Sequence, residues 1–134
     1  MPGIPAGLRD FATRYTAAWC SQDAARVAAH FSSNGSLSVN ESTPAIGRNA
    51  IQGVAQSFMN AFPDLQVILD GMEIKSDSAE YHWTLVGTNA GPAGSGKHVR
   101  ISGMERWKFG NDGLIASSEG VFDATDYERQ LAGT

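Results

Sequence analysis

Three acidic residues near the C-terminal end of this 134-residue chain have the types and spacing expected of proton-transfer groups. Glu105, Glu119 and Asp123 lie in the stretch ISGMERWKFGNDGLIASSEGVFD, where apolar and polar side chains alternate on both sides of Asn111-Asp112-Gly113. A period of two is typical of strands, and Asp-Gly is typical of a tight hairpin turn. We therefore predict two paired strands that bring these carboxyl groups toward one face of a sheet.

The length of the hairpin loop decides how the carboxyl groups meet. With a three-residue loop, Gly110 pairs with Leu114, Glu105 lies directly opposite Glu119, and Asp123 joins them on the same face. Two carboxyl groups opposed on an apolar face repel each other, so one keeps its proton near neutral pH while the other is ionised. That division of roles is the one that general acid–base catalysis next to a carbonyl group needs.

A two-residue loop gives a different arrangement. The pairing then slips by one residue, and Glu119 lies opposite Arg106 as a surface ion pair. Glu105 stays inward in both registers, because it alternates with Trp107 and Phe109. We therefore expect Glu105 to be the leading proton carrier, with Glu119 or Asp123 assisting it in the first register.

Composition and charge exclude several classes of protein. The apolar share of 42% and the charged share of 18% are those of an ordinary globular domain, and the length fits one domain. A net charge of −4 gives no reason to expect a nucleic-acid or anionic-membrane partner. Cys20 is the one cysteine, and the sequence has no signal pattern and no apolar run of membrane-spanning length, so we expect a cytoplasmic protein.

Histidine spacing does not indicate a metal site. His82 and His98 alternate out of phase with the inward residues of their strands, so we expect both on the outer surface. No histidine and carboxylate follow a ligand spacing such as His-Glu-x-x-His. The sequence predicts neither a metal nor a cofactor.

Hydrophobic periodicity predicts an α+β domain. Helices are expected at 7–20, at 24–31 after an N-cap within 21–23, and from 48 to the stop at Pro63; a last helical turn is expected at 127–131. A turn is expected at 33–35 and a loop at 41–47. Strands are expected at 36–40, 65–74, 80–88, 97–109 and 114–123. Helices that precede consecutive antiparallel strands predict a curved sheet with helices on one face and a pocket between them.

Aromatic residues could line that pocket, although an aromatic stripe at helical spacing more often packs a core. Tyr15 is of special interest, because a buried hydroxyl needs a partner and could donate to a ligand oxygen. Asn89 could hold a carbonyl group but could not transfer a proton. The residues that we expect to contact a ligand are Tyr15, Trp19, Phe31, Phe58, Phe62, Trp83, Asn89 and Trp107.

Five short motifs occur in the order seen in a known family: Gly47-Arg48-x-Ala50-Ile51, Ala61-Phe62-Pro63-Asp64-Leu65, Trp83-Thr84-Leu85-x-Gly87-Thr88, Ser102-Gly103-Met104-Glu105 and the Asp-Gly hairpin. Over 15–131 the chain resembles the SnoaL-like polyketide cyclases of the NTF2-like superfamily. The resemblance implies a cone-shaped α+β fold with a deep apolar pocket, a homodimer packed through the outer face of the sheet, and proton transfer by an acidic residue of the sheet. Family members often have His after the Gly-Thr pair, where this chain has Asn89.

The functional hypothesis is cofactor-free acid–base chemistry, such as aldol cyclisation or isomerisation, on a small or polycyclic apolar carbonyl compound. One alternative is a non-catalytic ligand-binding or dimerisation domain of the same fold. Another is an epoxide or ester hydrolase, which would need a positioned water molecule. The shared fold alone does not decide between them.

Overall fold

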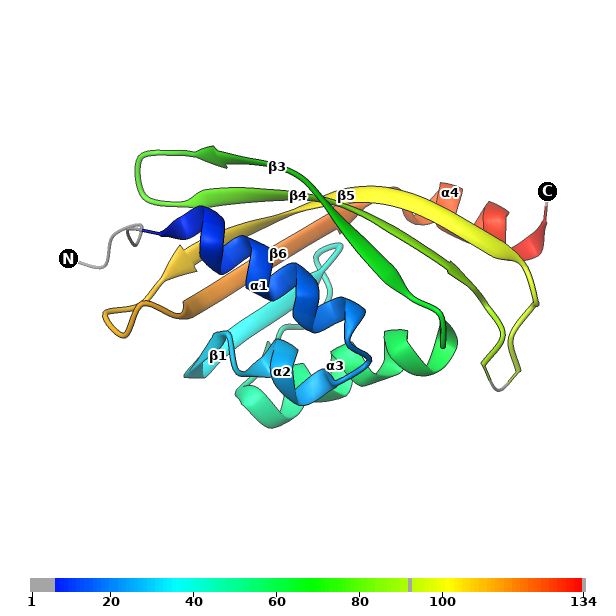
Figure 1. Cartoon of the computed structure of the whole chain (residues 1–134), viewed down its shortest axis with the longest axis horizontal. Coiled ribbons are helices and arrows are strands. Elements are labelled where there is room, and N and C mark those ends of the chain that lie inside the picture. The colour runs from blue at the N-terminus through cyan, green and yellow to red at the C-terminus, as the bar shows by residue number, and fades with distance from the viewer. Residues whose placement is uncertain (1–6, 92, 134) are drawn as a thin grey trace.

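The computed structural model describes residues 7–91 and 93–133, and a curved sheet that wraps around helices dominates it (Figure 1). The elements are α1 (Leu8–Cys20), α2 (Ala24–Ala28), β1 (Phe31–Val39), β2 (Ala45–Ile46), α3 (Arg48–Ala61), β3 (Gln66–Ile74), β4 (Ala79–Thr88), β5 (His98–Phe109), β6 (Ile115–Phe122) and α4 (Ala124–Ala132). The six strands have the order β2-β1-β6-β5-β4-β3. Only β1 and β6 pair in parallel, so the predicted α+β cone with a mainly antiparallel sheet is confirmed.

The helices begin and end where the local sequence requires. Asp23 caps α2, its side chain accepting a hydrogen bond from the Ala25 N–H at 3.1 Å. α3 ends at Ala61, just before Pro63, because proline cannot supply the next helical N–H. The described helices, of which α3 is the longest at 14 residues, include none that is both long and apolar enough to cross a membrane.

β1 differs from the prediction, because it continues through the expected turn at 33–35, where its register with β6 shifts between Phe31 and Ser36. α2 ends at Ala28, so Phe31 begins the strand instead of closing a helix. Gly35 explains the misreading: a Cβ atom there would lie 2.9 Å from the carbonyl oxygen of Ile115. This glycine permits two backbones to approach closely, a use that looks like a turn signal in the sequence.

The loop of the β5–β6 hairpin has three residues, the first of the two lengths considered above. The N–H of Gly110 donates to the carbonyl oxygen of Leu114 at 2.9 Å, and Gly113 takes the left-handed φ of 76° that such a loop requires. Phe109 then pairs with Ile115, as this loop length predicts.

A β-bulge beyond that first pair changes the register. Lys108 pairs with Ser117, so Ala116 is left as an extra residue on β6. From there on Arg106 lies opposite Glu119, and Glu105 lies opposite Gly120. The prediction that Glu105 faces Glu119 is therefore wrong, because the bulge cancels the effect of the three-residue loop.

Candidate functional site

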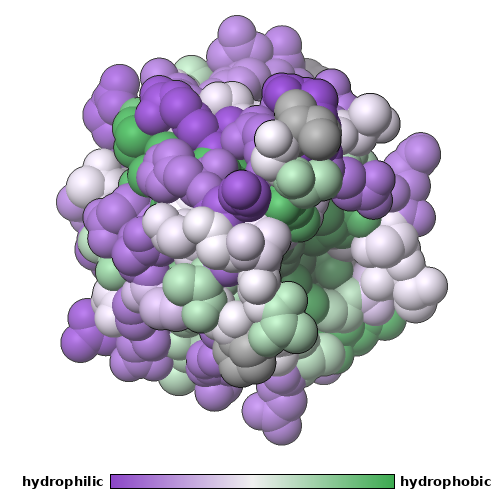
Figure 2. Space-filling view, turned by 90° about the vertical axis from the view of Figure 1, so that its right-hand side faces the viewer, coloured by the Kyte–Doolittle hydropathy of each residue, from purple (hydrophilic) through white to green (hydrophobic). Residues whose placement is uncertain are grey.

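An apolar cavity of about 60 Å³ lies between the concave face of the sheet and the helices α1 and α3. Figure 2 looks at the side on which α4 and the β4–β5 connection lie, and it shows hydrophobic residues gathered in a hollow there. Apart from Glu105 and Gly120, the residues that line the cavity are aliphatic or aromatic: Trp19, Leu37, Val39, Val54, Phe58, Val67, Tyr81, Trp83, Leu85, Ile101 and Phe122. Glu105 is thus the one acidic side chain among the described residues of the lining.

The carboxyl group of Glu105 is buried and held by three donors. Its Oε1 atom accepts hydrogen bonds from the Ser118 hydroxyl at 2.8 Å, the Trp107 indole N–H at 2.9 Å and the Tyr15 hydroxyl at 3.0 Å. The Oε2 atom accepts only a longer contact of 3.3 Å from the same Tyr15 hydroxyl. Oε2 is therefore the oxygen with capacity left for a ligand or a proton.

Burial and hydrogen bonding act on this carboxyl group in opposite directions. Burial raises the pKa of Glu105 above its ordinary value, because the ionised form loses its solvation. The donors Trp107, Ser118 and Tyr15 lower the pKa, but their combined effect is smaller. Burial and the nearby Glu105 carboxyl group also raise the pKa of Tyr15, so its hydroxyl stays protonated and donates.

Four elements position these groups. Glu105 and Trp107 share the inner face of β5, and Ser118 faces them because it pairs with Trp107 across the hairpin. On the other side Tyr81 of β4 pairs with Glu105, and its ring stacks on Trp107 with centroids 4.7 Å apart. α1 brings the Tyr15 hydroxyl down onto the carboxyl group from above the sheet.

Glu119 and Asp123 do not join Glu105. Glu119 is exposed on the outer face of β6, opposite Arg106. Asp123 lies past the end of β6 and caps α4, its side chain accepting a hydrogen bond from the Asp126 N–H at 3.0 Å. A cap residue must turn its side chain back to its own helix, so the predicted place of Asp123 beside Glu105 is wrong.

The expected ligand-contacting residues fall into three groups. Trp19, Phe58 and Trp83 line the cavity. Tyr15 and Trp107 lie behind the lining and hold Glu105. Phe31 and Phe62 belong to the core, where neither borders the cavity.

Asn89 has a structural role. Its side-chain N–H donates to the carbonyl oxygen of Ala61 at 3.2 Å, and its side-chain oxygen accepts from the N–H of Ser95 at 2.7 Å. These bonds fix the glycine-rich connection after β4 against the end of α3. The prediction that Asn89 holds a ligand finds no support in this geometry.

Sequence reasoning missed Ser118 as a partner of Glu105. Its inward direction follows from the register in which Arg106 lies opposite Glu119, which the two-residue loop would have given and which the bulge produces here. The alternation of side chains in β4 does predict that Tyr81 and Leu85, which also line the cavity, face inward. The indole N–H of Trp83 is buried and has no hydrogen-bond partner within the described part of the chain.

The curved sheet wrapped around helices is the NTF2-like, ketosteroid isomerase-like fold. The chain belongs to the SnoaL-like polyketide cyclase family, whose sequence profile matches residues 9–131. No curated protein sequence gives a significant match.

Solved structures of the same fold are similar over nearly the whole chain. TsrD from Streptomyces laurentii has a TM-score of 0.81 and 17% identity, with 96% of each chain covered. A hypothetical protein with a ketosteroid isomerase-like fold from Catenulispora acidiphila, solved in complex with trimethylamine, has a TM-score of 0.80 and 14% identity, with 92% of each chain covered. The epoxide hydrolase/cyclase-like enzyme SalBIII, which is described as acting in pyran ring formation in the polyether salinomycin, has a TM-score of 0.75 and 16% identity, with 88% of this chain and 92% of that one covered. At sequence identities this low, the similarity shows that the fold is shared and shows nothing about function.

Proposed function

We propose that this protein is a cofactor-independent acid–base catalyst that moves a proton at a carbon atom next to a carbonyl group. One observation supports the proposal above all others: Glu105 is a buried carboxyl group with a raised pKa, and it reaches an otherwise apolar cavity. A perturbed acid in a hydrophobic pocket is a common property of catalytic sites. Membership of a cyclase family agrees with this chemistry.

The lining favours a small, apolar ligand with one polar end. A cavity of about 60 Å³ is smaller than the roughly 150 Å³ that holds a benzene ring, so even a small ring compound requires half-buried side chains such as Phe58 and Phe122 to move. A polycyclic ligand would require much larger movements. Apolar walls provide no partner for additional polar groups, whose desolvation would then be uncompensated. We therefore favour a small cyclic ketone or diketone over a polycyclic compound.

Glu105 would exchange the proton through Oε2, because Oε1 already accepts three hydrogen bonds. The indole N–H of Trp83, a lining residue, has no hydrogen-bond partner among the described residues, so we assign to it the role of donor to the carbonyl oxygen of the ligand. A donor at that oxygen would stabilise the negative charge that develops as the neighbouring carbon loses its proton. These roles replace the earlier expectation that Asn89 orients the ligand.

The test follows proton exchange instead of a particular product. A panel of small cyclic ketones and diketones is incubated with the protein in deuterium oxide, and NMR measures the loss of the protons next to the carbonyl group. Glu105→Gln keeps the size of the side chain but cannot accept a proton. We expect the catalysed exchange rate to fall by about 10²–10⁴-fold, the usual contribution of a general base.

Glu119→Gln is the matched control, because it makes the same chemical change on the exposed outer face. Its exchange rate should equal that of the wild type. If Glu105→Gln folds normally and exchanges protons as fast as the wild type, the proposal is wrong. Binding of these ketones by the wild-type protein without any exchange would instead favour the non-catalytic alternative.

A further inference from the structure

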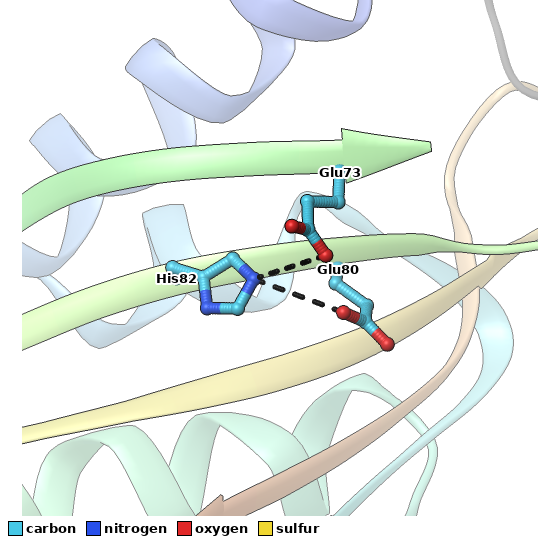
Figure 3. A group of neighbouring side chains, drawn as sticks. All are labelled: Glu73, Glu80 and His82. Carbon is cyan, nitrogen blue, oxygen red and sulfur yellow. Dashed lines mark ion pairs between the residues drawn. The ribbon is translucent and has the colours of Figure 1, made fainter. Parts of the chain in front are cut away.

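A second group of chemically active side chains lies on the outer face of the β3–β4 hairpin, away from the cavity. Glu73 of β3 pairs directly with Glu80 of β4, and His82 follows two residues later on the same face of β4 (Figure 3). Tyr81, between them in the sequence, points the other way and lines the cavity. The group is therefore separated from Glu105 by the thickness of the sheet.

The distances within this group are those of ligands arranged around an ion. The His82 Nε2 atom lies 3.7 Å from Glu80 Oε1 and 3.9 Å from Glu73 Oε2. One ligand atom from each of the three residues can be chosen so that all lie within 4.8 Å of one another. Ligands bound to zinc at about 2.0–2.2 Å are separated by about 3.3 Å in a tetrahedral site, so small rotations of the two flexible Glu side chains would suffice.

Two further features favour an ion over a simple ion pair. His82 Nε2 is shielded from solvent, is directed at both carboxylates and has no hydrogen-bond partner among residues 7–91 and 93–133. Two glutamates directly opposite each other on a strand pair also repel when both are ionised, and a cation placed between them would replace that repulsion with attraction. A divalent ion would satisfy the imidazole nitrogen and both carboxylates at once.

The cations already present do not fill this position. Lys75 Nζ lies 3.4 Å from Glu73 Oε2, and Arg106 Nη2 lies 3.7 Å from Glu80 Oε2. Arg106 thus contacts the oxygen of Glu80 that is not nearest to His82. Lys75 contacts the same oxygen of Glu73 that His82 approaches, so it would compete with an ion there.

We propose that Glu73, Glu80 and His82 form a binding site for a divalent transition-metal ion, with zinc the best match. One imidazole and two carboxylates are a ligand set that zinc accepts, and water would complete the coordination at this half-exposed position. Because one ligand comes from β3 and two from β4, the ion would fasten the two strands together near their connecting turn. The spacing of these residues along the sequence does not indicate a metal site, because the three ligands come together only when β3 and β4 pair.

The test uses the full-length protein, freed of metal with a chelator and titrated with zinc against a chromophoric competitor. We expect one ion for each chain and a higher thermal midpoint when zinc is added. His82→Ala and Glu80→Gln should each weaken binding by about a hundredfold or more, because even changes outside the ligand shell cost about 10–100-fold. Cobalt in place of zinc should give visible absorption bands that the His82→Ala variant lacks.

His98→Ala is the matched control, since His98 begins β5 outside this group and should bind zinc like the wild type. Lys75→Gln should strengthen binding several-fold, because it removes the competing ammonium group. Zinc binding that is absent in the wild type, or unchanged in His82→Ala, would overturn the proposal. Unchanged binding in Glu73→Gln would exclude Glu73 as a ligand and overturn the three-ligand site.

Discussion

Glu105 and Glu119 are chemically identical side chains whose surroundings make them different. Glu105 is 8% exposed and receives three donors inside an apolar cavity, whereas Glu119 faces solvent beside Arg106. Burial in the apolar cavity raises the pKa of Glu105, a perturbation that is common among proton-transfer groups.

The raised pKa of Glu105 predicts a specific pH dependence of stability. A folded-state pKa above the unfolded value means that the folded protein holds the proton more tightly, so the stabilisation is complete below the ordinary value of 4.5 and is lost as the pH rises through the folded pKa. Glu105→Gln mimics the protonated form at every pH. We expect the free energy of unfolding of the wild type, relative to this variant, to decrease by about 1.4 kcal/mol for each pH unit within that window. Urea unfolding of both proteins between about pH 4 and about pH 8 measures the difference, and two parallel curves would contradict the prediction.

Ser118→Ala should raise the pKa of Glu105 further. The change removes the shortest hydrogen bond to Oε1, which favours the ionised form of the carboxyl group. The loss should also cost about 1–2 kcal/mol of stability at a pH at which Glu105 is ionised. Titration of the carboxyl carbon of Glu105 by NMR measures the pKa. Ser117→Ala, one residue earlier and opposite Lys108 on the outer face, serves as the control and should leave the titration unchanged.

At the scale of elements, the β5–β6 hairpin shows what sequence patterns can and cannot predict. The two strands and the inward direction of Glu105 follow from alternation and from Asp112-Gly113, whereas the sequence leaves the loop length open between two and three residues. The bulge at Ala116 does not, because one extra alanine leaves no mark on the pattern of apolar residues. Its consequences are nevertheless large, since it reverses the face to which every later residue of β6 belongs.

Gly103 of β5 allows Trp83 to lie across the strand and form the cavity wall. A Cβ atom there would lie 2.5 Å from the Trp83 ring and 2.4 Å from the carbonyl oxygen of Val121, so side chain and backbone would both have to move. We expect Gly103→Ala to destabilise the protein by at least about 1–3 kcal/mol and to shift the tryptophan fluorescence. Gly71→Ala in β3, where nothing lies within 4 Å of the added atom, should change stability by less than about 1 kcal/mol. Equal effects of the two changes in urea unfolding would exclude this explanation.

Asp123 is expected to act as a helix cap and not in catalysis. Asp123→Ala removes the acceptor for the Asp126 N–H and should cost about 1 kcal/mol of stability. Asp123→Ser restores a capping oxygen without a carboxyl group, so it should recover most of that loss. Both variants should retain the wild-type rate of ketone proton exchange. A strongly reduced rate in a stable Asp123→Ser variant would return this residue to the catalytic site.

For the molecule as a whole, the sequence predicts the class of fold well and the details of the site less well. Helices against a curved sheet, and a cavity between them, follow from periodicity. The sequence does not show which aromatic residues line the cavity. Tyr15 and Trp107 lie on the same faces of their elements as the lining residues, but they are buried more deeply. Depth depends on how α1 rests on the sheet, and that packing involves residues far apart in the sequence.

We expect the protein to form a homodimer through the outer face of the sheet, as its resemblance to the family implies. Val121 is 44% exposed on this face, next to Met104 of β5. Sedimentation equilibrium should give twice the 14.2 kDa mass of one chain. Val121→Glu should favour the monomer, because it places a charge on the proposed contact surface. Ile46→Glu is the control: Ile46 is 69% exposed on the edge strand β2, and its change should leave the mass unaltered.

The position of β6 between β1 and β5 has a consequence for the order in which the protein folds. β6 is the last of the six strands along the chain, yet it joins the first long strand to the rest of the sheet. During synthesis the edge of β1 that pairs with β6 therefore stays unpaired until about 80 further residues have left the ribosome. Nascent chains that stop before Ile115 should expose this edge and depend on chaperones, whereas the completed chain should collapse and acquire the Ser118–Glu105 contact in one late step.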